Sequence, residues 1–423
     1  MIVEKTRPAG TVLRPWLLPG LLMAANTLSF VDRQILALLI DPIRRDLGLG
    51  DAAAGMLYGL GFTLSYLLAA FPLAWLADRV GPRRVIVGSV MVWSLATGLC
   101  GLARSFAALA AARMAVGLGE GGLTPAALAW INRQFPRERV ATMIGVFQSG
   151  IYLGNGLALL VGGWIALHFD PWVIHRVPVL GRLAGWHVAF ALLALPGLAL
   201  AAALALCPAP GPGDARLAPR EGDAAPWRIA PLPAVLIAAY ACFVMGGNGA
   251  QVWTPTLLQR HFGWAVHEAG FLLGSISLGC GMAGTLAGGL AADAMVRRAG
   301  PRGVITGTLL AVATVVPLAL AFPLVPWAAL AVILIAAHQA ASAFALCSGM
   351  AALQAVVPEA QRTRTTAVLM VAINLGGTLA GPWAMGAVSQ AWPLAGLGPA
   401  MALTGSLATA TAAVLLALAR RRA

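Results

Sequence analysis

Runs of about twenty apolar residues recur along the whole chain, and their length limits the possible folds more than any other feature. An α-helix rises 1.5 Å per residue, so a run of this length crosses a hydrocarbon layer of about 30 Å. Of the 423 residues, 60% are hydrophobic and only 10% are charged, too few charges for a water-soluble surface. The chain is therefore expected to be an all-α membrane protein.

Twelve transmembrane helices are expected. They lie near residues 16–40, 52–76, 84–103, 107–130, 141–167, 187–207, 231–258, 264–291, 303–321, 325–350, 365–390 and 396–419. The segment between the fifth and sixth spans carries Trp172, His175, Arg176 and Trp186 and is expected to be an interfacial loop. The polar, basic stretch before Trp16 lacks the apolar core of a signal peptide, so the first span is expected to be retained.

The net charge of +13 is distributed as short basic clusters between the apolar runs, which is typical of topology signals and not of a nucleic-acid site. No nucleic-acid partner is expected. The terminal segments and the loops on their side hold 20 basic residues, namely Lys5, Arg7, Arg14, Arg79, Arg83, Arg84, Arg133, Arg137, Arg139, Arg216, Arg220, Arg228, Arg297, Arg298, Arg302, Arg362, Arg364, Arg420, Arg421 and Arg422. The opposite loops hold six. Both termini are thus expected in the cytoplasm, and the Arg-, Ala- and Gly-rich composition suggests a bacterial inner membrane.

The chain also shows an internal duplication. The sequence Ala-Asp-Arg-Val-Gly-Pro-Arg at residues 77–83 is echoed by Ala-Asp at 292–293 and by Arg-Arg-Ala-Gly-Pro-Arg at 297–302. Residues 135–139 similarly resemble residues 357–364. Equivalent loops therefore recur about 220 residues apart, as in membrane proteins built from two repeats.

The repeats imply three regions. Residues 1–207 are expected to form an N-terminal six-helix bundle and residues 231–423 a C-terminal one. Residues 208–230 are rich in Pro, Gly and charge and are expected to be a cytoplasmic linker.

Residues 74–83, followed by Arg84, resemble the loop signature of the Major Facilitator Superfamily, Gly-x-Leu-Ala-Asp-Arg-x-Gly-Arg-Arg. Ala74 replaces the usual glycine and Pro82 a usual basic residue. Within that superfamily, residues 30–35 (Phe-Val-Asp-Arg-Gln-Ile) and 113–120 (Arg-Met-Ala-Val-Gly-Leu-Gly-Glu) resemble the spinster-like transporters. The resemblance implies a monomeric, proton-coupled secondary transporter that works by alternating access and moves a lysophospholipid or a similar amphipathic lipid.

Four fully charged residues fall inside the expected spans: Asp32, Arg33, Arg113 and Glu120. Each costs about 2.5–3.5 kcal/mol at a helix centre, so these side chains are expected to face a protein interior or a wet cavity. At 1.5 Å per residue, Asp32 and Arg113 lie at the same depth and Glu120 lies near the bilayer centre.

Arg113, Gly117, Glu120 and Thr124 follow the i, i+4, i+7, i+11 spacing of one helix face. The resemblance implies that the first and fourth helices border a central cavity. We hypothesise that Asp32 pairs with Arg113, that Glu120 takes up and releases the transported proton, and that Thr124 contacts the substrate. The alternative is a static network of charges that holds the two helices together.

A candidate cytoplasmic gate comprises Asp78, Arg79, Arg83 and Arg84, with Asp293 as the repeat counterpart of Asp78. Asp78 is interpreted as a latch residue because a lone acid has no use as a topology signal. The arginines equally satisfy the positive-inside rule.

Candidate substrate contacts are Asn248, Gln251, His338 and Gln339. Uncharged polar side chains in membranes more often bond neighbouring helices, and His338 is as readily a packed interior residue. Asn248 and Gln251 lie beside Gly246, Gly247 and Gly249, where a helix can break and expose backbone, so these two are the preferred substrate contacts.

The sequence also allows functions other than lipid transport. A small organic anion, such as a sugar acid or carboxylate, is the alternative substrate, and a membrane sensor that moves no solute is an alternative of another class. An enzyme is not expected because the nucleophile, zinc and phosphate-loop motifs are missing from the sequence. The five cysteines lack metal-ligand spacing, so no metal or cofactor is expected, and the driving force would be the proton gradient.

Overall fold

The computed structural model describes residues 16–135, 137–168, 174–177, 181–207, 230–358, 362–392 and 396–422. The first helices are α1 (Leu17–Asp46), α2 (Asp51–Val80), α3 (Pro82–Cys100), α4 (Phe106–Glu120), α5 (Leu123–Gln134), α6 (Arg137–His168) and α7 (Gly185–Leu206). The remaining ones are α8 (Pro231–Phe262), α9 (Val266–Ile276), the π-helical turn η1 (Ser277–Gly281), α10 (Met282–Ala321), α11 (Ala328–Val356), α12 (Arg362–Ile373), the π-helical turn η3 (Asn374–Ala380), α13 (Gly381–Ala391) and α14 (Leu397–Arg422).

Ten helical stretches among the described residues are long and apolar enough to cross a membrane. One of them, Val266–Ala321, contains two of the expected spans. They meet at Gly300, whose backbone (φ 60°, ψ −156°) interrupts the helix. The fourth expected span is α4 and α5 together, divided at Gly121 and Gly122. The helices therefore agree with the expected twelve-span fold, although the fourth span is not one continuous helix.

The duplicated loops have the same local structure. Gly81 ends α2 with φ 94°, and Pro82 follows as the first residue of α3. Gly300 has φ 60°, and Pro301 follows it at the start of the second part of α10. A positive φ favours glycine, and proline suits a first helical turn, so both repeats reverse the chain by the same means.

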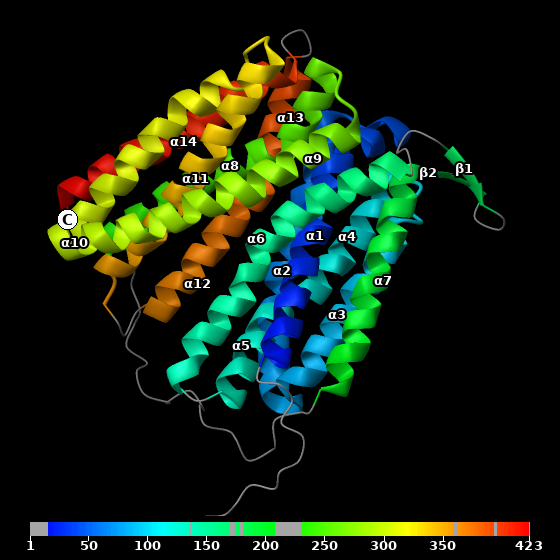
Figure 1. Cartoon of the computed structure of the whole chain (residues 1–423), viewed down its shortest axis with the longest axis horizontal. Coiled ribbons are helices and arrows are strands. Elements are labelled where there is room, and N and C mark those ends of the chain that lie inside the picture. Colours follow the sequence, from blue (N-terminus) through cyan, green and yellow to red (C-terminus); the bar gives the residue numbers. More distant parts are fainter. Residues whose placement is uncertain are drawn as a thin grey trace, which may run out of the picture.

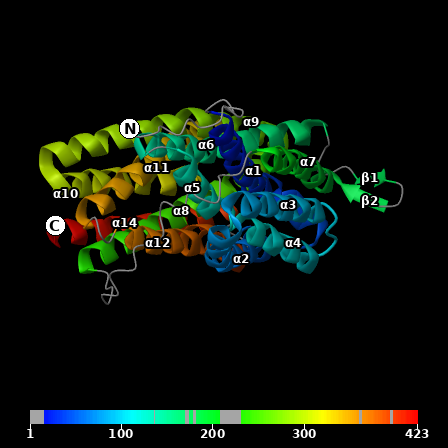
Figure 2. The same ribbon diagram turned by 90° about the horizontal axis from the view of Figure 1, so that it is seen from below.

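The helices form two bundles, α1–α7 and α8–α14, whose axes diverge across the view (Figure 1). Seen from below, the bundles lie side by side, with α9 next to α6 (Figure 2). The loop expected at the membrane interface contains a hairpin of β1 (Ile174–Val177) and β2 (Gly181–Ala184), with Ile174 paired to Ala184. The hairpin projects from the α1–α7 bundle (Figure 1).

Glycines bring the two bundles together near one end of the molecule. A Cβ added at Gly55 of α2 would lie 2.6 Å from the carbonyl oxygen of Pro382 in α13. A Cβ added at Gly270 of α9 would lie 2.9 Å from Cα of Gly163 in α6. These contacts lie toward the loops α1–α2 and α8–α9, which we call the closed end, and small residues there permit backbone contact.

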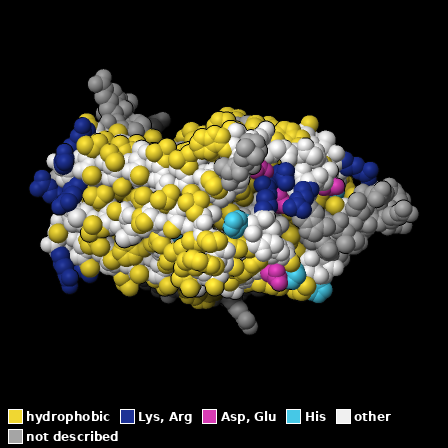
Figure 3. Space-filling model, turned by 90° about the horizontal axis from the view of Figure 1, so that it is seen from above, with side chains coloured by type: hydrophobic (Ala, Val, Ile, Leu, Met, Phe, Trp, Pro, Cys, Tyr) yellow, Lys and Arg dark blue, Asp and Glu magenta, His cyan; other side chains and the backbone are white. Residues whose placement is uncertain are grey.

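The surface fits a bilayer environment. Hydrophobic side chains cover much of the described face seen in Figure 3, whereas the arginines gather mainly at one extremity of the longest axis, with smaller groups elsewhere. The extremity belongs to the α8–α14 bundle, where Arg297, Arg298 and Arg302 of α10 and the last arginines of α14 are exposed. A broad apolar surface of this kind marks membrane contact.

Candidate functional site

Arg33 and Glu120 form the shortest ion pair of the α1–α7 bundle interior. The Nη2 atom of Arg33 lies 2.6 Å from Oε2 of Glu120, and its Nε donates to the same oxygen at 2.8 Å. Ser29, one turn before Arg33 on α1, donates to this oxygen as well, also at 2.6 Å. The Glu120 side chain is fully buried, whereas that of Arg33 is 16% exposed. The carboxylate of the pair therefore lies in the protein interior, and the guanidinium lies nearer to solvent.

Asp32 and Arg113 form a second, looser pair. Nη1 of Arg113 lies 3.7 Å from Oδ2 of Asp32, as the shared depth of the two residues suggested. Thr97 of α3 donates to the same Oδ2 at 2.7 Å. Both charged residues are almost completely buried. The two pairs together, Asp32–Arg113 and Arg33–Glu120, are called the central charged cluster below.

Aromatic rings surround the arginines of this cluster. The guanidinium carbon of Arg33 lies 4.9 Å, 4.6 Å and 5.0 Å from the ring centres of Phe30, Phe62 and Tyr66. Phe62 also lies 5.5 Å from the guanidinium of Arg113. Ring faces attract cations without adding a counter-charge, so the rings hold the guanidiniums in place whether or not the carboxylates are ionised.

Each carboxylate of the cluster has one oxygen free for a proton. Oε1 of Glu120 and Oδ1 of Asp32 are buried and have no hydrogen-bond partner among the described residues. A proton can bind such an oxygen without displacing an existing hydrogen bond. Neutralising Glu120 would also weaken its hold on Arg33. Protonation of Glu120 can therefore free Arg33 to pair with a different anionic group.

The expected stripe on the fourth span is only partly formed. Arg113 and Glu120 face α1, but a Cβ at Gly117 would collide with Phe62 and Ser65 of α2, so this glycine permits helix packing. Thr124 is half-buried and lies on α5, beyond the break after Glu120. A continuous helix from Arg113 to Thr124 was therefore the wrong expectation.

The break that the glycines of α8 would allow is not present. The helix runs unbroken from Pro231 to Phe262, and Gly246 and Gly249 let neighbouring helices pack closely against it. A Cβ at Gly249 would lie 3.0 Å from the carbonyl oxygen of Gly381. Asn248 and Gln251 are half-buried on α8, and neither side chain makes a hydrogen bond with a described residue. Their amides therefore remain available.

His338 and Gln339 lie on α11, in the other bundle from the central charged cluster. The His338 ring is buried and its centre lies 5.2 Å from that of Phe322. Gln339 is half-buried, and its amide lies 3.4 Å from the position of a Cβ added at Gly281 of η1. The contacts of both residues are within the α8–α14 bundle.

The candidate gate residues lie at the end opposite the closed end. The guanidinium of Arg79 lies 3.8 Å from the ring centre of Trp75, and Arg83 donates to the carbonyl of Ala205 in α7. Arg84 and Asp293 are exposed. Asp78 belongs to α2, and its side chain lies outside the described part of the structure. The contacts of Arg79 and Arg83 are thus local to the α1–α7 bundle.

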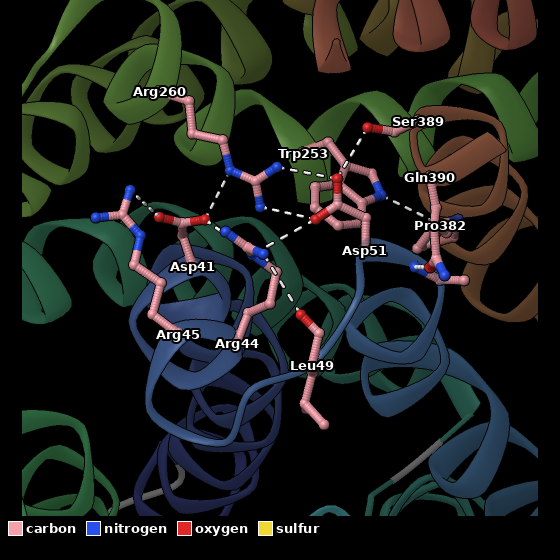
Figure 4. A network of polar contacts seen from close by, with 11 residues as sticks. Asp41, Arg44, Arg45, Leu49, Asp51, Trp253, Arg260, Pro382, Ser389 and Gln390 are labelled. Atoms are coloured by element: carbon pink, nitrogen blue, oxygen red, sulfur yellow. Dashed lines mark hydrogen bonds and ion pairs between the residues drawn. The ribbon is translucent and has the colours of Figure 1, made fainter. Parts of the chain in front are cut away.

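A second polar network, not anticipated from the sequence, joins the bundles at the closed end (Figure 4). Arg260 of α8 donates from Nη1 and Nη2 to the two carboxylate oxygens of Asp51 in α2, each at 2.9 Å. Its Nε donates to Asp41 of α1 at 2.7 Å. The network, called the Arg260 network below, comprises Asp41, Arg44, Arg45, Asp51, Arg260, Ser389 and Gln390.

The network was missed because two helices run further than expected. Helix α1 continues to Asp46 and α8 to Phe262, so Asp41 and Arg260 are helical residues and not loop residues. The expectation of only four charged residues within the membrane helices is corrected accordingly. Ser389 and Gln390 of α13 complete the link, at 2.8 Å to Asp51 and 3.2 Å to the amide of Ala52.

Two bundles of membrane helices, with buried charge in one and a polar link between them at one end, define a two-bundle membrane transporter. The family model of the Major Facilitator Superfamily matches residues 22–380, and the chain belongs to this family. The protein is therefore a multi-pass secondary transporter and not an enzyme.

Two relatives and one solved structure refine the comparison. An MFS-type efflux pump of Mycolicibacterium smegmatis is 28% identical over 89% of this chain and 85% of its own length. A probable galactarate/D-glucarate transporter of Bacillus subtilis is 26% identical over 69% of this chain and 68% of its own length. The structure of a bacterial homologue of the human lysosomal transporter spinster, inward-facing and occupied, is 25% identical, has a TM-score of 0.80 and covers 97% of this chain and 96% of that one. The resemblance to spinster-like transporters is thereby confirmed.

Proposed function

We propose that the protein is a proton-coupled transporter of an amphipathic lipid with an anionic headgroup, a lysophospholipid being the first candidate. The observation that carries the proposal is the ion pair between Arg33 and Glu120, in which Oε1 of Glu120 is buried and unpartnered. A proton on Glu120 weakens the pair and leaves Arg33 available to an anionic group. Proton and anion would thus bind together.

Asp32 serves as a second acid in this scheme. Its link to Arg113 is long, at 3.7 Å, and its Oδ1 is also unpartnered. Arg113 also contacts the Phe62 ring and donates to the Asp32 carbonyl, and both contacts remain when a proton neutralises the Asp32 side chain. The same residues form a static network in the alternative interpretation, which predicts no effect on proton coupling.

The rings around Arg33 support an amphipathic substrate. Phe30, Phe62 and Tyr66 give the cation an apolar surround that suits an amphipathic molecule better than a fully polar one. Similarity to the spinster homologue over 97% of the chain supports this choice. A small organic anion is the second candidate, because a galactarate/D-glucarate transporter is among the relatives and Arg33 suits a carboxylate.

In an alternating-access mechanism, the closed end and the opposite end of the molecule would open in turn. The positive-inside count supports an orientation with the closed end outside the cell and both termini in the cytoplasm of a bacterial plasma membrane. The Arg260 network then closes the outer side in an inward-facing state. Asp78, Arg79, Arg83, Arg84 and Asp293 would close the cytoplasmic side in the opposite state, across a pair of six-helix domains of one monomer.

The proposal is tested by reconstitution in liposomes. Uptake of lysophosphatidylglycerol and of glucarate is measured with and without an imposed pH gradient, for the wild type, Glu120→Gln and Glu268→Gln. Glu268 is a matched control because its carboxylate accepts from the Ala265 amide at the start of α9, far along the chain from the cluster. Gradient-driven uptake of the lipid is expected to vanish in Glu120→Gln and to persist in Glu268→Gln.

Three results would contradict this function. Full gradient-driven uptake by Glu120→Gln would exclude Glu120 as the coupling group. Uptake of glucarate but not of the lipid would favour the second candidate substrate. Binding of either compound without any flux would favour a membrane sensor over a transporter.

A further inference from the structure

A groove lined by arginines lies at the far end of the α8–α14 bundle, away from the Arg260 network. Its volume is about 630 Å³, and its cationic walls are Arg298 and Arg302 of α10 and Arg420 of α14. The remaining lining is small or apolar, with Met295 and Ala299 among it. The residues belong to the basic extremity seen in Figure 3, where the C-terminus lies beside the bend of α10 in Figure 1.

No acidic residue in the described part of the chain balances the charge of these three arginines. They are exposed, and none makes an ion pair with a described acidic residue. Because Gly300 interrupts α10, Arg302 also lies in the first turn of the following helical segment, where the helix dipole adds partial positive charge. The groove is therefore suited to an anion.

The groove continues into an apolar, exposed surface on both sides of the bend. Leu290 lies one turn before the lining residue Ala294, and Leu310 lies one turn after the lining residue Thr306. Leu290 is 73% exposed and Leu310 63% exposed. In a membrane helix such side chains contact acyl chains. A cationic groove thus stands directly at the end of an acyl-facing surface.

We propose that this groove binds an anionic phospholipid of the surrounding bilayer, with the phosphate between Arg298, Arg302 and Arg420 and the acyl chains along Leu290 and Leu310. A free phosphate would use the arginines but not the leucines, whereas a zwitterionic lipid would bring its own cation close to them. Charge and apolar surface together favour an anionic lipid. The site is separate from the central charged cluster, so a bound lipid here is a structural partner and not the transported molecule.

The test counts lipids retained by the full-length protein. Native mass spectrometry is performed on protein released from nanodiscs that hold phosphatidylglycerol and phosphatidylcholine in equal amounts. The groove variant combines Arg298→Gln, Arg302→Gln and Arg420→Gln. The matched control combines Arg297→Gln, Arg421→Gln and Arg422→Gln, which removes the same charge from the same extremity but spares the lining.

The wild type and the control are expected to retain one phosphatidylglycerol in preference to phosphatidylcholine. Each arginine near a membrane surface strengthens anionic lipid binding about five-fold, so the groove variant is expected to lose affinity on the order of a hundred-fold. Replacing the three arginines by lysine should restore most of the binding. An equal loss in both triple variants, or retention in the groove variant with an unchanged melting temperature, would overturn the proposal.

Discussion

Arg260 of α8 donates two parallel hydrogen bonds of 2.9 Å to the carboxylate of Asp51 in α2, and this pair joins the two bundles at the closed end. The same guanidinium reaches Asp41 of α1, so one side chain ties two helices of one bundle to a helix of the other. A planar guanidinium matches a carboxylate in this fork geometry better than an ammonium would. The link must break whenever the closed end opens.

The first prediction concerns this link. Arg260→Gln is expected to shift the protein toward a state in which the closed end opens, because Asp41 and Asp51 lose their partner from the other bundle. The side chain is 21% exposed, so the change is expected to be about 1–2 kcal/mol, or roughly 5–30-fold in population. The measurement is the distance between spin labels at Leu49→Cys and Ala265→Cys in a cysteine-free background.

Arg44→Gln provides the matched control. Arg44 lies within 3.3 Å of Asp41 and 3.5 Å of Asp51, so its loss removes the same charge from the network. These contacts stay within one bundle. If Arg44→Gln lengthened the label distance as much as Arg260→Gln does, total charge and not the connection between bundles would set the equilibrium.

The second prediction concerns backbone contact between bundles. Gly55→Ala places a methyl group 2.6 Å from the carbonyl of Pro382, which α13 can relieve only by moving away. The closed end is expected to be destabilised by about 1–3 kcal/mol, while each bundle keeps its own packing. The same pair of spin labels reports the change. Gly247→Ala is the control, since open space surrounds Gly247 on α8, and a comparable shift there would contradict the explanation.

The fold could be predicted from the sequence because it depends on local features of the chain, namely the length of each apolar run and the residues at each turn. Apolar runs of membrane-spanning length and the Gly-Pro turns at Gly81 and Gly300 set the number and reversal of the spans. The shared depth of Asp32 and Arg113 followed from helix rise alone, and the two residues do lie within ion-pair distance. The transport roles of these residues stay predictions.

The partners in the site depend on helix rotation and exact helix length, which the sequence pattern does not specify. The pairing of Arg33 with Glu120 required two successive residues of α1 to meet the same face of α4 at two different levels. The Arg260 network required α1 to extend past Ile40 to Asp41 and beyond. One signal was available: acids and arginines of opposite sign concentrate at residues 41–51, which is unusual for a short membrane loop.

The third prediction concerns Phe62, whose ring stands between two guanidiniums of the central charged cluster. Phe62→Leu removes the attraction to Arg33 and Arg113, each worth about 0.5–2 kcal/mol, in addition to some packing. The thermal unfolding midpoint in detergent should fall further than for Phe190→Leu. Phe190 is equally buried but contacts Trp186 and no described cation. Equal losses would show that packing alone holds the ring.

The last prediction concerns the two free amides on α8. Asn248 and Gln251 are three residues apart on one helix face. Neither side chain makes a hydrogen bond within the described structure. Such groups can bond a substrate headgroup, so Asn248→Ala and Gln251→Ala are each expected to raise the KM for the transported molecule about 5–10-fold. Proton coupling, measured as uptake driven by a pH gradient at saturating substrate, should be retained.

Asn374→Ala is the control for this prediction, because it removes the same side chain from η3 where the amide already donates to the carbonyl of Met370. A protein that uses α8 for substrate contact should show an unchanged KM in this variant. If instead all three substitutions raised the KM alike, loss of polar groups anywhere in the bundle would weaken transport. The amides of α8 would then be ordinary packing residues, and the substrate would rest on the α1–α7 bundle alone.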